Sequence, residues 1–362
     1  MTQRLDPWGQ VKIEDYRKLF DEFGIESFEK FKNRFSENRY VRRGIVFGHR
    51  DFDKIVSAID SKKPYVMITG LMPSGKFHFG HKMVAEQMIW HQKLGAEIYV
   101  CVADMESYLM RGISFEDARK IAVDEYLTNY IALGLTEKNL HVYFQSDYVV
   151  AYYRFRDSLS GKATLNELKA IYGELTPSKI FSVFTQVADI LHVQLGGFSG
   201  KVPTVVPVGP DQDPHIRLTR DIASKLDLIQ PSSTYHKFMT GLQGGKMSSS
   251  DPKSHIALTE DLPSAKKKLM GAKTGGRATA EEQKKLGGVP EECAVYELMV
   301  YHLVEDDKEL LGIHDSCTSE GLSCGECKKV CWEKLEKFLT EHQVRRQNGK
   351  KAVENLIRII QP

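Results

Sequence analysis

The chain has 362 residues, of which 41% are hydrophobic and 27% are charged, and its formal net charge at pH 7 is +2. This composition is typical of globular proteins, and the length is sufficient for two hydrophobic cores, so we expect two globular domains. No apolar run approaches the roughly 20 residues of a membrane span, the first residues lack the apolar segment of a secretion signal, and the charge does not indicate a dedicated polyanion binder. We therefore expect a cytoplasmic protein that binds neither membranes nor DNA.

Residues 1–60 are predicted to form an N-terminal appendage of short helices. The aromatic residues of this segment, among them Tyr16, Phe20 and Phe23, recur at helical spacing. Such a stripe is more typical of a packed core than of a surface on which bases stack.

Residues 61–261 are predicted to form a domain in which strands and helices alternate. We expect strands at 65–68, 97–103, 141–144 and 204–208, a helix at 79–93 with Ala85, Met88 and Ile89 inward, and a helix from Ser114 to about 132. This alternation predicts an α/β, Rossmann-like parallel sheet with right-handed crossovers. The alternation of strands and helices is interrupted at about 148–184, where we expect a helical insertion. Residues 262–362 are predicted to form an all-helical C-terminal domain.

The loop predicted at 69–75 leaves a strand, and the helix after it begins with two histidines. His78 and His81 are three residues apart, so both project to one side of the helix start. The unpaired N–H groups and the positive dipole end attract phosphate there, and Gly80 leaves room for a flat ring against the backbone. The alternative is that the two histidines only cap the helix.

A second segment, Lys246-Met247-Ser248-Ser249-Ser250, places a lysine in a loop rich in hydroxyl groups. Alone, Lys246 could be a solvated loop lysine. Both segments in this order indicate a site that holds a triphosphate from two sides.

These segments resemble the H-x-G-H and K-M-S-K-S signatures of class I aminoacyl-tRNA synthetases, with Ser249 replacing the second lysine. The run from Val206 to His215, followed by Leu218-Thr219-Arg220-Asp221, is similar to the tryptophanyl-tRNA synthetase family. Segments near both ends are similar to its archaeal and eukaryotic branch: Asp6-Pro7-Trp8, Arg42-Arg43-Gly44-Ile45, His49-Arg50-Asp51 and Glu341-His342-Gln343-Val344-Arg345-Arg346.

The resemblance implies activation of L-tryptophan by ATP and Mg²⁺ and its transfer to tRNA(Trp). It also implies a homodimer that forms through the insertion, and anticodon recognition by the helical domain. In the family's pattern His78, His81 and Lys246 are catalytic. The implied ATP-binding residues are Pro73, Ser74, Gly80, Gly209, Asp211, Lys246, Met247, Ser248, Ser249 and Ser250. Asp211, at a strand end, could equally be a helix N-cap.

The implied tryptophan-binding residues are Ile68, Glu106, Gln186, Asp189 and Gln212. Asp189 resembles the aspartate that accepts the indole N–H, although related tyrosine enzymes place an aspartate similarly for the phenol. Ile68 and Cys101 stand where the archaeal and eukaryotic branch tends to have tyrosine and glutamine. Cys101 by itself indicates only a small buried residue.

Five of the six cysteines lie in the predicted helical domain. Cys293, Cys317, Cys324 and Cys327 could hold zinc or a 4Fe-4S cluster, or could be scattered reduced thiols. Their pattern resembles that of tryptophanyl-tRNA synthetases that carry the cluster, and Cys331, one turn further on, leaves open which four would bind.

Three other functions compete with the tryptophan enzyme. A tyrosine-tRNA ligase is disfavoured by Ile68 and by the run from Gly209 to His215. A synthetase-like RNA-binding protein without catalysis would have no chemical reason to retain His78, His81 and Lys246. Another nucleotidyltransferase would not explain the helical domain with its clusters of lysine and arginine.

Overall fold

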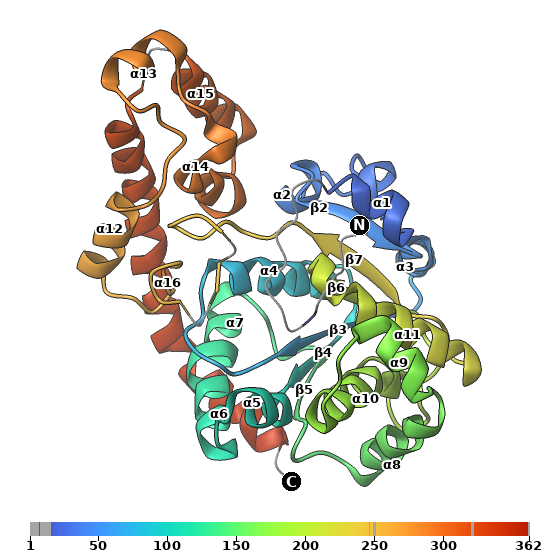
Figure 1. Cartoon of the computed structure of the whole chain (residues 1–362). Helices are drawn as coiled ribbons and strands as arrows, with labels where there is room; N and C mark the ends of the chain where they lie inside the picture. Colours follow the sequence, from blue (N-terminus) through green and yellow to red (C-terminus); the bar gives the residue numbers. More distant parts are fainter. Residues whose placement is uncertain (1–6, 8–15, 246, 249–250, 320–321, 361–362) are drawn as a thin grey trace.

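The structure is a computed structural model that describes residues 7, 16–245, 247–248, 251–319 and 322–360 (Figure 1). Across these residues seven strands form one sheet in the order β1-β2-β7-β6-β3-β4-β5. The strands are β1 (Glu26–Ser27), β2 (Val46–Arg50), β3 (Val66–Leu71), β4 (Glu97–Val102), β5 (Leu140–Phe144), β6 (Thr204–Val208) and β7 (Ser232–His236). Strands β3 to β7 pair in parallel, whereas β1 and β2 pair antiparallel.

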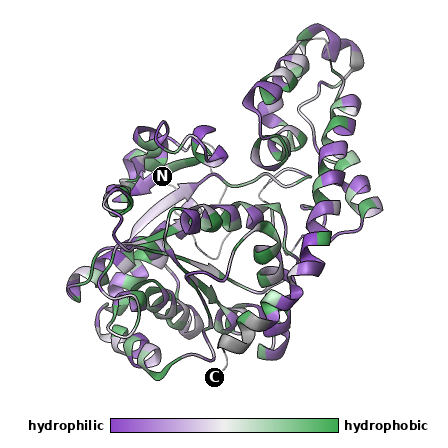
Figure 2. Ribbon diagram, turned by 180° about the vertical axis from the view of Figure 1, so that it is seen from behind, coloured by the Kyte–Doolittle hydropathy of each residue, from purple (hydrophilic) through white to green (hydrophobic). Residues whose placement is uncertain are grey.

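The two faces of the sheet pack against separate hydrophobic cores. Side chains alternate along a strand, so on β3 Met67 and Leu71 belong to one core and Val66 and Ile68 to the other. The first core includes residues of α4 (Phe79–Lys93) and α7 (Thr128–Leu133), and the second includes residues of α10 (Pro177–Leu191) and α11 (Asp213–Lys225). Figure 2 shows hydrophobic residues at the centre of the sheet and many hydrophilic ones on the outer helices. The predicted Rossmann-like α/β fold is confirmed.

Several predicted elements are found at their expected positions. Helix α4 spans the predicted residues, and Ala85, Met88 and Ile89 are buried. The helix predicted from Ser114 begins as α6 (Phe115–Ile121), with the Ser114 hydroxyl accepting the Asp117 N–H. It continues through the π-helix η2 (Ala122–Leu127) into α7. Strand β6 also matches its prediction.

Three parts of the sheet differ from the expectation. Strand β3 continues through Thr69 and Gly70, which we had predicted to be loop, because both pair with β4. In the segment expected to contain only short helices, β2 pairs with β7 between α2 (Arg39–Arg42) and α3 (Phe52–Asp60). Strand β7 was not predicted, because its sequence, Ser-Ser-Thr-Tyr-His, is polar although all five residues are buried.

The segment predicted as an insertion, at about 148–184, contains α8 (Val150–Ser158), α9 (Leu165–Tyr172) and the first part of α10. Thr164 and Glu167 form a reciprocal capping box at the start of α9, and the Thr176 hydroxyl accepts a backbone N–H before Pro177 at the start of α10. These signals fix the two helix starts. Helix α10 carries Asp189 in its last turn and thereby brings it to the sheet.

The C-terminal part is helical, as expected, and its last helix packs back against the α/β part of the chain (Figure 1). Its helices are α12 (Leu262–Met270), α13 (Ala280–Leu286), α14 (Ala294–Leu298), η7 (Met299–Leu303), α15 (Asp307–Thr318) and α16 (Cys324–Ile360). In α16 the His342 Nε2 lies 2.6 Å from Asn129 Oδ1, and Gln343 donates to the Glu260 carbonyl. The domain boundaries at 61 and 262 stay a prediction.

Three arginines of the N-terminal segment hold the C-terminal helices against the sheet. Arg42 and Arg43 form ion pairs with Asp307 at 2.9 and 2.6 Å, and Arg39 donates to the His302 carbonyl. The N-terminal segment thus connects the sheet, through β2, to the helical part. In the described part of the chain, no helix combines the length and apolar character that crossing a membrane requires.

Candidate active site

The two histidines of the first signature form the start of α4. His78 is the N-cap, and its Nδ1 accepts the Gly80 N–H at 3.1 Å, while His81 Nδ1 accepts the His78 N–H at 3.2 Å. The two rings stack with centroids 3.9 Å apart. The expectation that they project to one side is confirmed, and so is the capping interpretation. The same bonds fix the orientation of both rings.

Both imidazoles are neutral at physiological pH. Burial lowers the pKa of His81 to about 3, and burial together with repulsion from His81 and His255 lowers the pKa of His78 further below its usual range. Because each Nδ1 accepts a hydrogen bond, the neutral ring carries its proton on Nε2. His81, which lines the smaller of the two cavities described below, therefore offers a hydrogen-bond donor to an anion without positive charge.

The space beside Gly80 is occupied by the His78 ring. A Cβ at Gly80 would lie 3.0 Å from the His78 Cε1 atom. The His78 ring would have to move by a few tenths of an ångström to admit that Cβ, so glycine is favoured there, and the binding of a flat ligand ring against Gly80 stays a prediction.

The second signature lies against the first. Lys246, Ser249 and Ser250 fall outside the described residues, whereas Met247 and Ser248 are described. The Met247 N–H donates to the Met239 carbonyl, and Ser248 exchanges hydrogen bonds with Ser254. The Met247 sulfur would lie 3.8 Å from a Cβ at Gly80. The two segments are thus adjacent in space, although more than 160 residues separate them in sequence.

His255 joins the two segments, and the sequence analysis missed it. Its Nδ1 donates to the Ser248 carbonyl at 3.0 Å, and its ring centroid lies 4.7 Å from that of His78. Next to it, Ala257 forms an antiparallel bridge with His78. The position of His255 just after the second signature was a signal, but its contact with His78 depends on the fold.

A cavity of about 720 Å³ opens beyond the carboxyl ends of β3, β4 and β6, where ligands bind in such sheets. It brings together many of the residues predicted for ATP or tryptophan: Ile68, Glu106, Gln186, Asp189, Gly209, Asp211, Gln212, Met247 and Ser248. A second cavity of about 430 Å³ adjoins it and is lined by Ser74, His81 and Ser248, among others. Arg111, not predicted, lines both. Pro73, His78 and Gly80 lie outside the linings of these two cavities.

At one end of the larger cavity, Asp189 is surrounded by hydrogen-bond donors. Its Oδ1 accepts the hydroxyls of Tyr143 at 2.9 Å and Tyr152 at 2.6 Å, and its Oδ2 accepts the Gln145 amide at 2.7 Å. Burial raises the pKa of this carboxyl, although the donors oppose the shift. Sequence reasoning missed the two tyrosines and Gln145, which approach Asp189 from β5 and α8.

The predicted residues on the other walls are held by short polar networks. Glu106, on α5 (Asp104–Arg111), accepts hydrogen bonds from Ser182 and Gln186 of α10. Gln212 is the N-cap of α11, so the alternative that Asp211 caps this helix is wrong. A Cβ at Gly209 would lie 2.6 Å from the Phe238 ring and 2.7 Å from Asp211 Oδ1, which explains the glycine there.

The four predicted cysteine ligands converge between the helices of the C-terminal part. Burial raises the pKa of Cys327 to about 12, with repulsion from Cys293, Cys317 and Cys324 adding to the shift. A Cβ at Gly276 would lie 2.7 Å from the Cys324 sulfur, and one at Gly288 would lie 2.8 Å from the Cys317 sulfur. The two glycines therefore leave room beside the thiols. For these described cysteines, no three sulfurs lie within 4.8 Å of one another.

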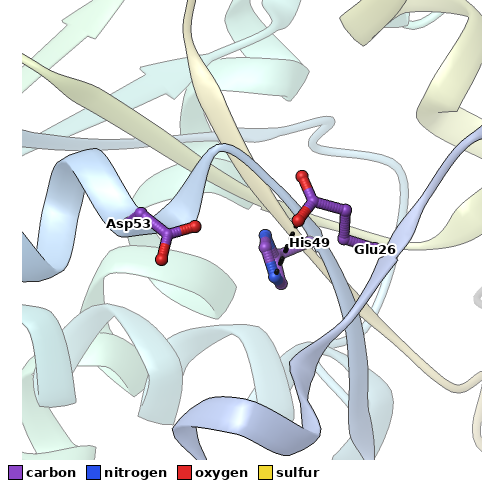
Figure 3. A group of neighbouring side chains, drawn as sticks. All are labelled: Glu26, His49 and Asp53. Carbon is purple, nitrogen blue, oxygen red and sulfur yellow. Dashed lines mark ion pairs between the residues drawn. The ribbon is translucent and has the colours of Figure 1, made fainter.

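A separate group of possible metal ligands lies near the N-terminal segment. Glu26 and Asp53 lie on opposite sides of His49, which is buried (Figure 3). The Lys30 ammonium lies 2.7 Å from Asp53 and 3.6 Å from Glu26, so a lysine already balances both carboxylates. His49 Nδ1 accepts the Phe52 N–H, which places the proton on Nε2, the atom nearer Glu26. This group is therefore explained without a metal.

Comparison with known proteins identifies the relatives of this chain. The family model described as tRNA synthetases class I (W and Y) matches residues 60–340. Tryptophan–tRNA ligase of Aeropyrum pernix is 50% identical, with 98% of each chain covered, and that of Methanocaldococcus jannaschii is 47% identical over the same shares. The crystal structure of the A. pernix tryptophanyl-tRNA synthetase superposes with a TM-score of 0.91 over 97% of this chain and 98% of that one. The tryptophan-bound enzyme of Encephalitozoon cuniculi, at 25% identity, superposes with 0.83 over 96% and 98%.

The depressed pKa of His81 predicts acid sensitivity. A histidine with a lowered folded-state pKa binds its proton more readily when unfolded, so its contribution to stability is present above pH 6.5 and is lost as the pH falls toward 3. Between pH 7 and 5 one such group lowers the free energy of unfolding by about 2 kcal/mol. His81→Asn should reduce the acid-induced loss by up to this amount in urea unfolding at the two pH values.

The matched control is His314→Asn. Pairing with Glu291 and Asp315 raises the pKa of the more exposed His314, so its removal should not reduce the acid sensitivity. Equal losses for the parent and His81→Asn would contradict the assignment of a neutral His81.

Proposed function

The chain belongs to the class I tRNA synthetases of the tryptophan and tyrosine family, and we propose that it is a tryptophan–tRNA ligase. The observation that carries this proposal is the match to tryptophan–tRNA ligases over 98% of the chain at 47–50% identity. Its reaction has two steps, the activation of L-tryptophan by ATP and the transfer of the activated amino acid to tRNA(Trp). A cytoplasmic location is part of this proposal because charged tRNA is consumed in protein synthesis.

In the first step, a tryptophan carboxylate oxygen bonds to the α-phosphorus of ATP, and the bond from that phosphorus to the bridging oxygen breaks. Pyrophosphate leaves and tryptophanyl-AMP remains. No protein nucleophile is needed, so catalysis depends on positioning and on stabilising the phosphoryl charge. Magnesium, when bound, would supply further positive charge at the phosphates.

We assign the α-phosphate to the start of α4, where the neutral His78 and His81 rings and the helix dipole favour an anion. Lys246 acts on the departing pyrophosphate, and Ser248, Ser249 and Ser250 bind phosphate oxygens or stabilise the loop. The proposal is supported by the position of Met247 beside Gly80 and by His255, which contacts both Ser248 and His78. Pro73 positions the loop, since its carbonyl accepts the Ser107 hydroxyl, and Ser74 lines the smaller cavity.

The larger cavity holds the amino acid and the ribose. We place the indole at Asp189 against Ile68, and the α-amino group and ribose near Glu106, Gln186, Gly209, Asp211 and Gln212. A buried acceptor that only a side chain with a donor can satisfy penalises phenylalanine. Tyrosine is the nearest competitor, because its phenol also carries a donor.

For the second step, a ribose hydroxyl at the tRNA 3′ end attacks the adenylate carbonyl and AMP leaves. We propose that helices α12 to α16 recognise the anticodon. We also propose a homodimer formed through the insertion, and the exposed apolar side chains of Val150 and Leu165 support that contact.

We propose that Cys293, Cys317, Cys324 and Cys327 hold a 4Fe-4S cluster. Cys324 and Cys327 lie in the first turn of α16, where the helix dipole stabilises thiolates. Tetrahedral zinc would bring four sulfurs to about 3.8 Å from one another, given its Zn–S distance of about 2.3 Å. In a cluster each of the four thiolates would bind a different iron, whereas zinc would be held by all four at one ion, and the metal analysis below separates the two. When bound, the cluster supplies cohesion to the helical domain.

The function is tested by ATP–pyrophosphate exchange with each of the twenty amino acids. Tryptophan should support exchange far above tyrosine and phenylalanine. Exchange with tyrosine alone would indicate the tyrosine enzyme, and no exchange with any amino acid would indicate a non-catalytic protein.

In this assay Lys246→Ala should lower the exchange rate by roughly 10²–10³-fold, since its charge acts where pyrophosphate charge develops. Tryptophan affinity should change little. Lys253→Ala, an exposed lysine of the same loop, is the matched control and should keep the parent rate. Weaker tryptophan binding at an unchanged rate would contradict the role of Lys246.

The cluster is tested by anaerobic purification followed by iron, sulfide and zinc analysis. The parent should contain iron and sulfide, and Cys324→Ser should lose both and have a less stable helical domain, with exchange preserved because the thiols lie outside the nucleotide fold. Cys331→Ala is the control: this thiol is fully buried and lies 4.0 Å from the Val295 carbonyl, so the variant should keep its iron. If the parent contained no metal and the Cys324→Ser variant were as stable as the parent, the four cysteines would be ordinary reduced thiols and the proposed cluster would be wrong.

A further inference from the structure

Gln145 lies at the same end of the larger cavity as Asp189. It follows β5 directly and is 1% exposed. Its backbone N–H donates to the Val102 carbonyl at 3.0 Å, and its carbonyl accepts the Tyr153 hydroxyl at 3.2 Å. The backbone is therefore held on both sides, and the side chain is placed among the residues that line the cavity.

The orientation of the Gln145 side-chain amide is fixed by Asp189. Its Nε2 donates to Asp189 Oδ2 at 2.7 Å. Rotating the amide by half a turn would place two oxygens against each other, so this hydrogen bond assigns the positions of nitrogen and oxygen. The oxygen, Oε1, is consequently presented on the other side of the amide.

Most of the acceptor capacity of Asp189 is already used by side chains of the protein. A carboxylate offers about four lone-pair positions. The hydroxyls of Tyr143 and Tyr152 occupy two on Oδ1, and the Gln145 amide occupies one on Oδ2. The donors around Asp189 are all side chains of the protein.

Gln145 Oε1, in contrast, is a buried acceptor that receives no hydrogen bond from any described residue. An unsatisfied buried acceptor is costly, and native proteins rarely leave one without a donor from protein, water or ligand. Here the oxygen belongs to a residue that lines the cavity assigned to the substrate.

We propose that Gln145 Oε1 accepts the indole N–H of tryptophan, and that Asp189 is a positioning residue that holds the Gln145 amide in the required orientation. This inference rests on the proposed function and identifies the atom that distinguishes tryptophan from side chains without an N–H group. Phenylalanine would leave Oε1 without a donor, which gives the site its selectivity. The glutamine comes from β5, next to the β4 strand on which Cys101 stands.

The test compares tryptophan with β-(3-benzothienyl)alanine, in which sulfur replaces the indole N–H at similar size. In amino-acid-dependent exchange, Gln145→Met should lower kcat/KM for tryptophan by about ten- to hundredfold and change that for the analogue little, so that their ratio falls by the same factor. Gln194→Met is the matched control, because Gln194 is equally buried but is satisfied by the backbone of Ile229. It should leave the ratio at the parent value.

Asp189→Ala tests the positioning role through a double-mutant cycle. If Asp189 acts through Gln145, adding Asp189→Ala to Gln145→Met should not lower the ratio further. A Gln145→Met protein that keeps the parent ratio would overturn the inference, whatever its absolute activity. A parent protein that does not activate tryptophan would instead overturn the proposed function.

A crystal structure of the parent with tryptophan tests the inference without any variant. The indole nitrogen should lie within about 3.2 Å of Gln145 Oε1 and beyond hydrogen-bond reach of Asp189. An indole nitrogen within hydrogen-bond distance of Asp189 and beyond the reach of Gln145 Oε1 would show that Asp189 accepts the indole N–H.

Discussion

The candidate site depends on one contact, the one between the start of α4 and the loop that carries the second signature. The His78 and His81 rings cap the helix and stack on each other, and the His255 ring packs on His78 while binding the Ser248 carbonyl. This contact closes a site that neither segment could form alone. The parallel sheet makes it possible, because β3 delivers α4 to the edge at which β6 and the cavity residues also end.

The site combines two ways of burying polar groups. At the start of α4, to which we assign the phosphates, the histidines are neutral, so they can be buried without the cost of desolvating a charge. At the amino-acid end, a carboxyl is buried, and tyrosine hydroxyls and an amide satisfy it. The first arrangement makes stability sensitive to acid, whereas the second fixes the direction of the Gln145 amide and with it the selectivity of the pocket.

The sequence predicted the elements whose signals are local. The bounds of α4 follow from its apolar spacing, the start of α6 from the Ser114 cap, and β6 from its apolar run. Strand β7 was missed because its polar side chains are buried by tertiary contacts, with β2 and β6 on either side. The role of His255 and the donors around Asp189 also depend on contacts between distant segments. A pattern search cannot supply these contacts, because it lists residue types without their neighbours.

The measurement that tests this account most directly is the single-turnover rate of tryptophanyl-adenylate formation by His255→Ala. His255 reaches the Ser248 carbonyl and the His78 ring but lies outside the linings of the two cavities described above, so its loss should separate the two signatures without altering the amino-acid pocket. The account predicts a rate at least tenfold lower with unchanged tryptophan affinity. A variant that forms adenylate at the parent rate would show that the contact between the signatures is not what assembles the site.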